Sequence, residues 1–390
     1  MGKSRLPTGG TNLFQMIKAK SAEAEAKGIK LLKLSIGQPS GPALLSARRA
    51  AAVAIMNEKE SMHEYQDNGS PGVPDFAKRF IQFHLPSLDH VAVDYLPIPG
   101  IKPILGLVPL ACGCRQQAVK VATTTNPGYP TPRDWCGYLG VKIQELPLTV
   151  ENAFRFSLDD IEGDVAVIMM NYPHNPSGQV ATREWLEELC DLCVAKGIRI
   201  FNDAAYIALS HTEESVTLAR VADKFPGLSW AEAYSASKLI GNGTGWRIGA
   251  IVGSPDFVAD LKTVKGNTDS GFVAPMAAGV LAAIIEDKEG ISRCREIYGH
   301  RMKILINLLS VQGMQLAVQP GAGFFTLWKT PKTAFGETVQ DAQHFNFTMI
   351  ERVGVVGVHF HPYIRYAVCS DIEAMLHDLN AAFQKAKVSY

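Results

Sequence analysis

The sequence predicts an α/β protein in which a large domain with a mainly parallel central sheet, flanked by helices, carries a smaller α+β domain. The length of 390 residues is too great for one small domain, and the apolar fraction of 47% is ample for a large core. The middle of the chain alternates short apolar runs with helical patterns, whereas both flanks mix helices with scattered short strands. We therefore expect an N-terminal arm that joins the small domain (1–45), a large domain (46–285) and the rest of the small domain (286–390).

The strands of the expected central sheet are short apolar runs. The clearest is Val165–Met170, which is apolar throughout, as expected of a strand covered on both faces. An amphipathic helix follows near Arg183–Lys196, and Gly197 ends it. The other runs predicted as strands are 119–123, 141–146, 198–201, 231–235 and 248–252.

Composition and charge exclude several classes of function. The 38 Lys and Arg residues balance 38 Asp and Glu residues, which excludes bulk attraction to nucleic acid or to an anionic membrane as the main role. No apolar run reaches the roughly 18 residues of a membrane span. The polar start, residues 1–12, lacks the apolar segment of a secretory signal, so we expect a cytoplasmic protein with reduced cysteines. Cys190 and Cys193 form a C-x-x-C without a second pair, which favours packing over a metal site.

Polar side chains follow three of the predicted strands. Ligands of open parallel sheets bind beyond the carboxyl ends of the strands. There the chain carries NYPHNPSG (171–178), NDAAY (202–206), and SASK (235–238) with TGWR (244–247) further on. An amide, a carboxylate with a phenol, and a lysine with hydroxyls and an arginine can together hold a planar aromatic aldehyde that carries a phosphate.

These motifs resemble the signatures of the class I/II aminotransferases, which are fold-type I enzymes that use pyridoxal 5′-phosphate (PLP). The resemblance runs from about Leu34 to Tyr366 and includes LSIGQPSGP (34–42), PGYP (127–130) and IRYAV (364–368). Each motif alone is weak, but together and in this order they are highly specific. The resemblance implies the fold-type I architecture, PLP as cofactor, and an amino acid and a 2-oxo acid as substrates.

The resemblance also implies roles for residues around the cofactor ring. Lys238 would form a Schiff base with PLP and later move a proton, which requires a low pKa. Asp203 would face the pyridine nitrogen and keep it protonated, so that the ring can accept an electron pair. Asn175 and Tyr206 match positions that hydrogen-bond the phenolic oxygen, and Tyr129 matches the aromatic that stacks on the ring. The structural alternatives are a surface charge for Lys238, a helix cap for Asp203 and a turn before proline for Asn175. For Tyr206 the alternative is half-buried core, and for Tyr129 it is a rigid turn.

The phosphate end is implied by a second set of matches. Ser235, Ser237 and Arg247 resemble the phosphate-site residues. Arg247 lies nine residues after Lys238 where the family pattern has eight, and a glycine bulge within 241–243 is the simplest explanation.

Backbone groups and one arginine complete the implied site. Gly100, Ile101 and Lys102 match the turn that opens a helix under the phosphate, where backbone N–H groups bind. The hydroxyl that the family often carries near Ile101 is absent. Arg365 matches the fork that clamps the substrate α-carboxylate, and Gly37 matches a backbone contact to the same group.

A tyrosine before a glycine-rich stretch points to a second subunit. In the family, a tyrosine near the position of Tyr65 reaches the phosphate of the neighbouring subunit, which implies a homodimer with shared active sites. The distance from Tyr65 to Gly72 is longer than the family pattern has. His359 and His361 form H-x-H, for which we favour loop or pocket lining over metal binding.

The leading hypothesis for function is transamination through Lys238. The alternatives are a PLP-dependent C–S β-lyase, or other α-carbon chemistry, and a non-catalytic binding protein of the same fold, which the intact lysine disfavours. Segments 99–102 and PGYP look more like the diaminopimelate and succinyl-diaminopimelate branch than the mammalian-type aspartate branch. We expect Gly321–Phe325 to line the pocket for the substrate side chain.

Overall fold

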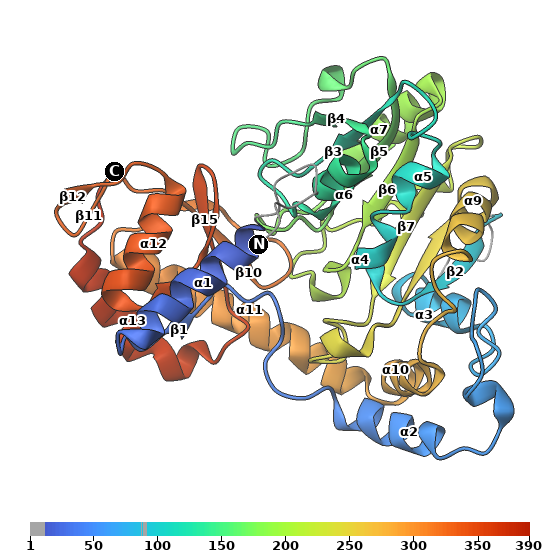
Figure 1. The fold of residues 1–390 in the computed structure, drawn as a ribbon, viewed down its shortest axis with the longest axis horizontal. Coiled ribbons are helices and arrows are strands. Elements are labelled where there is room, and N and C mark those ends of the chain that lie inside the picture. The colour runs from blue at the N-terminus through green and yellow to red at the C-terminus, as the bar shows by residue number, and fades with distance from the viewer. Residues whose placement is uncertain (1–11, 87, 89–91) are drawn as a thin grey trace, which may run out of the picture.

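The central sheet organises the larger body of the molecule (Figure 1). The structure is a computed structural model that describes residues 12–86, 88 and 92–390, so nearly all of the polar start considered above lies outside the described residues. Within those ranges the sheet has seven strands in the order β2-β8-β7-β6-β5-β3-β4. The strands are β2 (Asp94–Ile98), β3 (Lys120–Thr123), β4 (Lys142–Glu145), β5 (Val165–Met170), β6 (Arg199–Asp203), β7 (Trp230–Ser235) and β8 (Gly249–Gly253).

The strand directions confirm the predicted mainly parallel sheet. Strands β7, β6, β5, β3 and β4 run parallel, and within the described part of this sheet the antiparallel pairings are those of β8 with β7 and with β2. The prediction for 165–170 matches β5, and the other predicted runs agree to within a few residues. Strand β2 was not predicted: it is a sheet edge and contains Pro97, which lacks a donor for a ladder and so weakens the strand pattern.

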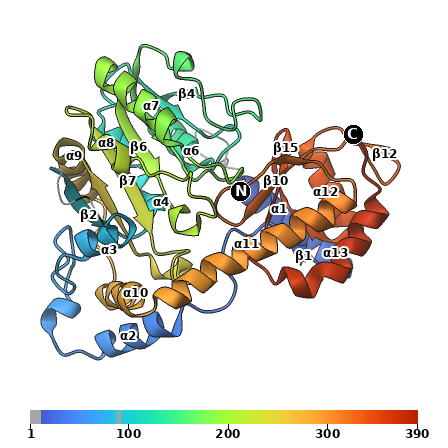
Figure 2. The ribbon, with the colours of Figure 1, turned by 180° about the vertical axis from the view of Figure 1, so that it is seen from behind.

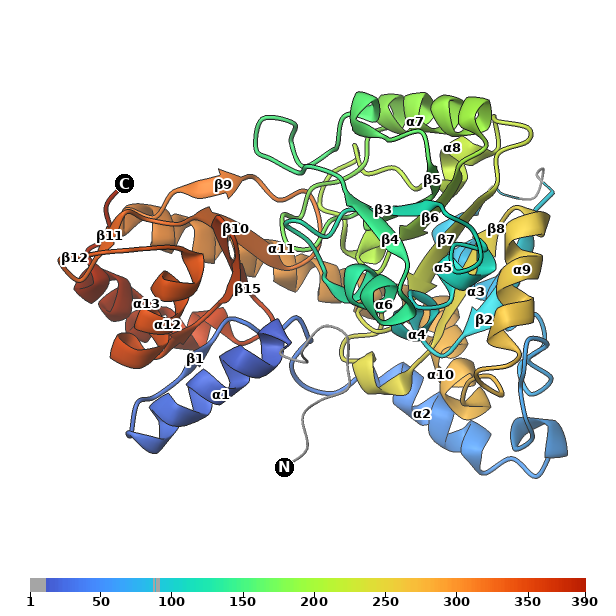
Figure 3. The same cartoon turned by 45° about the horizontal axis from the view of Figure 1, so that its top comes forward.

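Helices cover both faces of this sheet, because successive strand residues point to opposite sides. On one face Ile168, Ile200 and Tyr234 share a core with residues of α3 (Phe76–His84), α7 (Arg183–Lys196), α8 (Ala219–Ala222) and α10 (Ala274–Glu286). On the other face Val167 and Phe201 pack with residues of α4 (Ile101–Ile104), α5 (Val108–Ala111), α6 (Thr131–Leu139) and α9 (Pro255–Lys265). Figure 3 shows α7 and α8 on one side of the sheet and α4 and α6 on the other. Helix α7 has the predicted bounds, and Gly197 ends it with a left-handed φ of 65°.

The smaller body is built from both ends of the chain around a four-stranded antiparallel sheet of order β14-β15-β10-β9. Leu32 and Leu34 lie in one core with Phe325 and Tyr366, so the N-terminal segment is part of this body. Its elements are α1 (Leu13–Ala26), β1 (Leu32–Lys33), β9 (Leu316–Val318), β10 (Phe325–Lys329), β11 (Thr333–Ala334), β12 (Glu337–Thr338), α12 (Ala342–Val353), β13 (Val355–Val356), β14 (Val358–Phe360), β15 (Tyr363–Ala367) and α13 (Ile372–Ala386).

Two helices lie where the chain passes between the bodies. Helix α2 (Leu45–Ile55) packs on α10 of the larger body. Helix α11 (Lys288–Val311) contributes Ile291 to the larger core and Tyr298 to the smaller one, and Figure 2 shows it running from one body to the other. We keep 45/46 and 285/286 as proposed domain boundaries. Among the described helices none is both long and apolar enough to cross a bilayer.

A loop contact holds the two bodies together beside the carboxyl ends of the central strands. The carbonyl oxygen of Gly178, in the loop after β5, accepts hydrogen bonds from Gly321 N (2.9 Å) and Ala322 N (3.0 Å). Gly178 has a φ of 70°, and a Cβ at this position would lie 2.7 Å from the Pro320 Cβ. Only glycine therefore fits this contact without strain.

We expect Gly178→Ala to lower the free energy of unfolding by about 1–3 kcal/mol more than Gly197→Ala, because the added methyl group overpacks the contact. Gly197 is a matched control, since it has a similar φ of 65° but no atom within 4 Å of the Cβ position. Its alanine variant should lose only the roughly 1–2 kcal/mol of a left-handed residue. Urea unfolding of both variants measures the difference, and equal losses would contradict the role of the contact.

Candidate active site

A cavity of about 1160 Å³ lies at the carboxyl ends of β5, β6 and β7, between the two bodies. The structure brings most of the sequence-predicted site residues to its wall. These are Gly37, Ile101, Lys102, Tyr129, Asn175, Asp203, Tyr206, Ser235, Ser237, Lys238, Arg247 and Arg365. Gly100 and Tyr65 do not line it. Tyr65 is 77% exposed and lies in a separate hollow of about 270 Å³, which Arg247 also lines.

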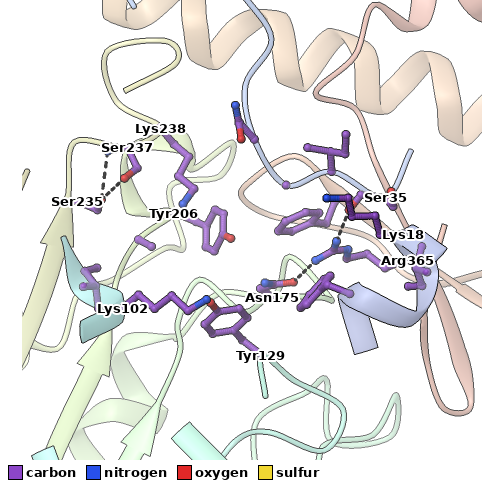
Figure 4. A pocket seen from close by; sticks show the side chains of 18 of the residues that line it. Lys18, Ser35, Lys102, Tyr129, Asn175, Tyr206, Ser235, Ser237, Lys238 and Arg365 are labelled. Atoms are coloured by element: carbon purple, nitrogen blue, oxygen red, sulfur yellow. Dashed lines mark hydrogen bonds between the residues drawn. The ribbon is translucent and has the colours of Figure 1, made fainter. Parts of the chain in front are cut away.

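An amine and a carboxylate that influence each other's charge lie in the wall of this cavity. Lys238 follows β7, its side chain points into the cavity (Figure 4), and its Nζ lies 5.3 Å from the centroid of the Tyr206 ring. Burial lowers the pKa of Lys238, and the nearby charge of Asp203 opposes that effect. Burial in turn raises the pKa of Asp203 to about 6, and Lys238 opposes this rise. The enclosure therefore favours a neutral, nucleophilic amine on Lys238.

Hydrogen bonds from the neighbouring strand end hold Asp203 in place. Its Oδ1 accepts from Ala205 N at 3.1 Å. Its backbone oxygen accepts from Asn171 Nδ2 at 2.7 Å, and Asn171 Oδ1 accepts from Asn175 N at 2.9 Å. Hydrogen bonds thus connect the segment after β5 to the segment after β6 where both line the cavity.

Arg365 of β15 is a buried cation that reaches the cavity from the smaller body. It is 1% exposed, and it donates to Asn175 Oδ1 (2.9 Å) and to the Ser35 backbone oxygen (2.7 Å) (Figure 4). Its guanidinium carbon lies 4.2 Å from the centroid of the Phe325 ring, and its Nε has no hydrogen-bond partner among the described residues. Burial lowers the pKa of Arg365 to about 10, so it stays charged at neutral pH. A buried guanidinium without a carboxylate partner in the described chain suits an anionic ligand.

Hydroxyls and an arginine form the opposite end of the cavity. Ser235 Oγ donates to Ser237 Oγ at 2.9 Å and accepts from Ser237 N at 3.1 Å. Arg247 donates to the backbone oxygens of Thr244 (2.9 Å) and Pro99 (3.3 Å).

A glycine turn accommodates the extra residue before Arg247. Gly241 has a φ of 74°, and Gly243 N donates to the backbone oxygens of Ser237 (3.2 Å) and Gly241 (3.1 Å). The chain then reaches Arg247, which itself has a left-handed φ of 57°. A Cβ on Gly100 would lie 2.1 Å from Arg247 Nη2, so Gly100 supports the site by leaving room for this arginine.

Sequence reasoning missed the contribution of α1 to the cavity. Phe14, Ile17 and Lys18 line it from that helix, and the Lys18 side chain points inward (Figure 4). The sequence carries no motif for this contact, because the docking position of a terminal helix depends on packing with α12. Of the segment expected to line the side-chain pocket, Gly321–Phe325, only Phe325 is a wall residue, so the expectation for the other four is corrected. Gly321 and Ala322 form the contact with the loop after β5 instead, Gly323 N donates to the Leu209 backbone oxygen (2.9 Å), and Phe324 lies in the core of the smaller body.

The histidines singled out in the sequence lie at different depths. His174 is buried, its Nδ1 lies 2.7 Å from Ser177 Oγ, and burial lowers its pKa to about 3, which fits the structural role expected of it. His359 is half-buried and lies 3.3 Å from Asn346 Nδ2. No group of three or more His, Cys, Asp or Glu side chains in the described ranges is placed to hold a metal ion.

Solved structures that resemble this chain define its class. Substrate-bound BacF from Bacillus subtilis has a TM-score of 0.84 at 20% identity, covering 100% of this chain and 99% of that one. A probable N-succinyldiaminopimelate aminotransferase from Thermus thermophilus has a TM-score of 0.81 at 21% identity, covering 96% and 100%. The aspartate aminotransferase of Thermus thermophilus has a TM-score of 0.81 at 20% identity, covering 99% and 98%. The fold is therefore that of the fold-type I aminotransferases, as predicted.

Sequence comparison gives the family. The model of aminotransferase class I and II matches residues 29–373, and the chain belongs to this family. Its relatives include the LL-diaminopimelate aminotransferase of Methanocaldococcus jannaschii, 28% identical over 372 residues that cover 91% of this chain and 85% of the relative. The enzyme of the same name from Syntrophobacter fumaroxidans is 31% identical over 384 residues, 93% and 92% of the two chains. The protein is an aminotransferase, as the leading hypothesis predicts, and the role of Lys238 stays a prediction.

We expect Asp203→Asn to lower the apparent pKa of Lys238 in the cofactor-free chain, because a nearby negative charge favours the protonated amine. Lys238 should then react faster with an acylating reagent at neutral pH, as followed by peptide mass spectrometry. The difference from the wild type should vanish as the pH falls through about 6, where Asp203 itself takes up a proton. Asp134→Asn is the control, since Asp134 lies near Lys102 instead. Identical rates in both variants would exclude the proposed coupling.

Proposed function

We propose that this aminotransferase binds PLP through Lys238 and moves an amino group between an amino acid and a 2-oxo acid. The observation that carries the proposal is the pairing of Lys238, whose pKa is lowered, with the buried Asp203 in one cavity. Such a pair suits an aldehyde cofactor with a basic ring nitrogen. We also propose a cytoplasmic location, in keeping with seven cysteines that are all free thiols in the described chain.

The wall residues fit PLP at each of its groups. Lys238 Nζ would hold the aldehyde carbon, and Asp203 would face the ring nitrogen. The Asn175 amide and the Tyr206 hydroxyl would meet the ring oxygen, and Tyr129 would cover the ring face. The residues that would hold the phosphate are Ser235, Ser237, Arg247 and the backbone N–H groups that open α4 at Ile101 and Lys102.

The chain's own groups then have defined tasks. When bound, PLP supplies an aldehyde that condenses with amines and a ring that accepts an electron pair. The amine of Lys238 holds the proton that leaves the substrate Cα and delivers it again, for which its lowered pKa is suited. Arg365 takes the substrate α-carboxylate with its buried guanidinium, and Gly37 offers its backbone beside it. Fixing the carboxylate orients the Cα–H bond toward Lys238, which is an effect of proximity and orientation.

Borohydride reduction tests the covalent attachment. We expect reduction of the PLP-loaded protein to place one label on the peptide that contains Lys238, and we expect Lys238→Ala to lose both the label and turnover. Lys102→Met is the matched control, because it removes another lysine of the same cavity and should keep the label. A label on any other lysine, or turnover of the Lys238→Ala variant near that of the wild type, would falsify the proposal.

We propose an amino donor with a second, distal acidic group, of which LL-diaminopimelate is the model. The name of the relatives supports this proposal, and so do two cavity lysines, Lys18 and Lys102, that form no salt bridge with a described residue. The other basic residues of the wall are occupied: Lys33 pairs with Glu25, and the proposal gives tasks to Lys238, Arg247 and Arg365.

A half-reaction screen of the standard amino acids and diaminopimelate measures the preference. We expect Lys18→Met to raise the KM for the distal-acid donor about two- to fivefold, as for an exposed ion pair worth about 0.5–1 kcal/mol. The KM for alanine should stay the same, since alanine has no distal acid. An equal change for both donors would contradict the proposal.

We further propose a homodimer in which Tyr65 serves the second active site. The exposed apolar side chains support it: Val53 is 72% exposed, Met56 82% and Val273 50%, and Val273 lines the same hollow as Tyr65. Tyr65 shares its hollow with Arg247, so a second copy seated there would approach the phosphate end of the cavity.

A further inference from the structure

A carboxylate is buried on the face of the central sheet that lies opposite Asp203. In the register of β6 and β7, Glu232 pairs with Asn202 and Ala233 pairs with Asp203. Because side chains alternate along a strand, Glu232 and Asn202 point to the face covered by α7 and α8. Glu232 is 0% exposed, so it contacts neither solvent nor the cavity.

Four uncharged donors surround this carboxylate. Its Oε1 accepts from Asn202 Nδ2 (2.7 Å) and Leu218 N (3.0 Å). Its Oε2 accepts from Ala219 N (2.9 Å) and the Tyr234 hydroxyl (2.7 Å). Burial raises the pKa of Glu232, and these four hydrogen bonds oppose the rise. No described basic residue forms a salt bridge with Glu232, and a buried charge held in this way costs stability that an apolar side chain would not.

Glu232 determines which way the amide of Asn202 points. A carboxylate can only accept hydrogen bonds, so the NH₂ group of Asn202 must face it. The amide oxygen then accepts from Tyr172 N (2.9 Å), and the second amide hydrogen is donated to Tyr172 O (3.0 Å). With the amide reversed, its oxygen would oppose the carboxylate and both bonds to Tyr172 would be lost.

The segment held in this way carries residues of the active site. Tyr172 lies between Asn171, which bonds to Asp203 and to Asn175, and Asn175, which accepts from Arg365. Hydrogen bonds therefore lead from Glu232 through Asn202 to Tyr172, and the backbone connects Tyr172 to Asn171 and Asn175 of the cavity wall. Building on the proposed PLP function, we propose that Glu232 is a positioning residue that orients Asn202, which in turn fixes the 171–178 loop so that Asn175 meets the cofactor and Arg365.

Two variants and a matched control separate positioning from stability. Asn202→Ala removes the two hydrogen bonds to Tyr172. Glu232→Gln keeps the side-chain shape, but the NH₂ group of the new amide then faces the donors that surround the carboxylate. Tyr234→Phe removes one donor from the same carboxylate and leaves every bond of Asn202 intact. If Glu232→Gln does not fold, Asn202→Ala carries the comparison with Tyr234→Phe.

Amide hydrogen exchange of the cofactor-free chain is the first readout, since it does not depend on PLP. We expect Asn202→Ala and Glu232→Gln to speed exchange at Tyr172 and Asn175 by about fivefold or more, as for the loss of one net hydrogen bond. Tyr234→Phe should leave these rates unchanged even if its melting temperature falls.

The PLP-loaded protein gives the second readout. Asn202→Ala and Glu232→Gln should shift the pH midpoint of the visible absorbance of bound PLP. They should also weaken the binding of an unreactive 2-methyl amino acid about fivefold, whereas Tyr234→Phe should change neither quantity. The positioning role is overturned if all three variants lose stability alike while three quantities match the wild type: the amide exchange rates of the 171–178 loop, the pH midpoint of the absorbance, and the affinity for the 2-methyl amino acid. Failure of the wild type to take PLP on Lys238 would instead refute the proposed function and leave the exchange result standing.

Discussion

One constraint brings the site together: the segments of the larger body that carry it lie at the same edge of the central sheet, where the smaller body contributes Arg365. Parallel pairing aligns the carboxyl ends of β5, β6 and β7, with Met170 opposite Asn202 and Asp203 opposite Ala233. The antiparallel strand β8 begins where β7 ends, since Gly249 pairs with Ser235, so Arg247 enters at this edge as well. Strand β2 ends there too, because Ile98 pairs with Gly249 and delivers the turn at Gly100. Residues spread over some 150 positions of the chain thus meet around one cavity.

The cavity is chemically biased toward anions because its cations outnumber its acids. Lys33 of the wall pairs with Glu25 at 3.5 Å, which leaves Asp203 as the other carboxylate of the wall. The other basic residues of the wall are Arg247, Arg365, Lys18 and Lys102, besides Lys238, whose lowered pKa favours the neutral amine. Removing a charge from water weakens screening, so the buried Arg365 attracts a carboxylate more strongly than a surface arginine would, whereas Lys18, Lys102 and Arg247 are exposed to solvent. The same enclosure lowers the pKa of Lys238 and raises that of Asp203, and it therefore tunes the chemistry while it selects the ligand.

Sequence reasoning succeeded where local chemistry decides the outcome and stopped where packing decides it. The apolar run of β5 and the left-handed end of α7 at Gly197 follow from composition and turn chemistry, and the motifs placed Lys238 and Asp203 in one cavity. Strand β2 was missed because Pro97 disrupts its pattern, and the order of strands depends on pairings that no single segment encodes. Lys18 reaches the cavity only because α1 docks on α12, two elements more than 300 residues apart. Such long-range contacts produce no local pattern in the sequence.

Glu232 shows the same limit at a finer scale. In the sequence it is a charged residue inside an otherwise apolar strand. One of its partners, Tyr234, is two residues along the same strand, but the others come from β6, 30 residues away, and from the start of α8, 13 and 14 residues away. The location of Glu232 has a physical reason. The β5–β6 ladder ends at Met170 and Asn202, and Tyr172 lies beyond the end of this ladder. The Asn202 side chain supplies the two hydrogen bonds that a longer strand would have made with its backbone. The chain can therefore leave the sheet, and the loop can turn toward Arg365, without leaving a buried backbone group unsatisfied. This arrangement requires the Asn202 amide in the one orientation that the Glu232 carboxylate fixes.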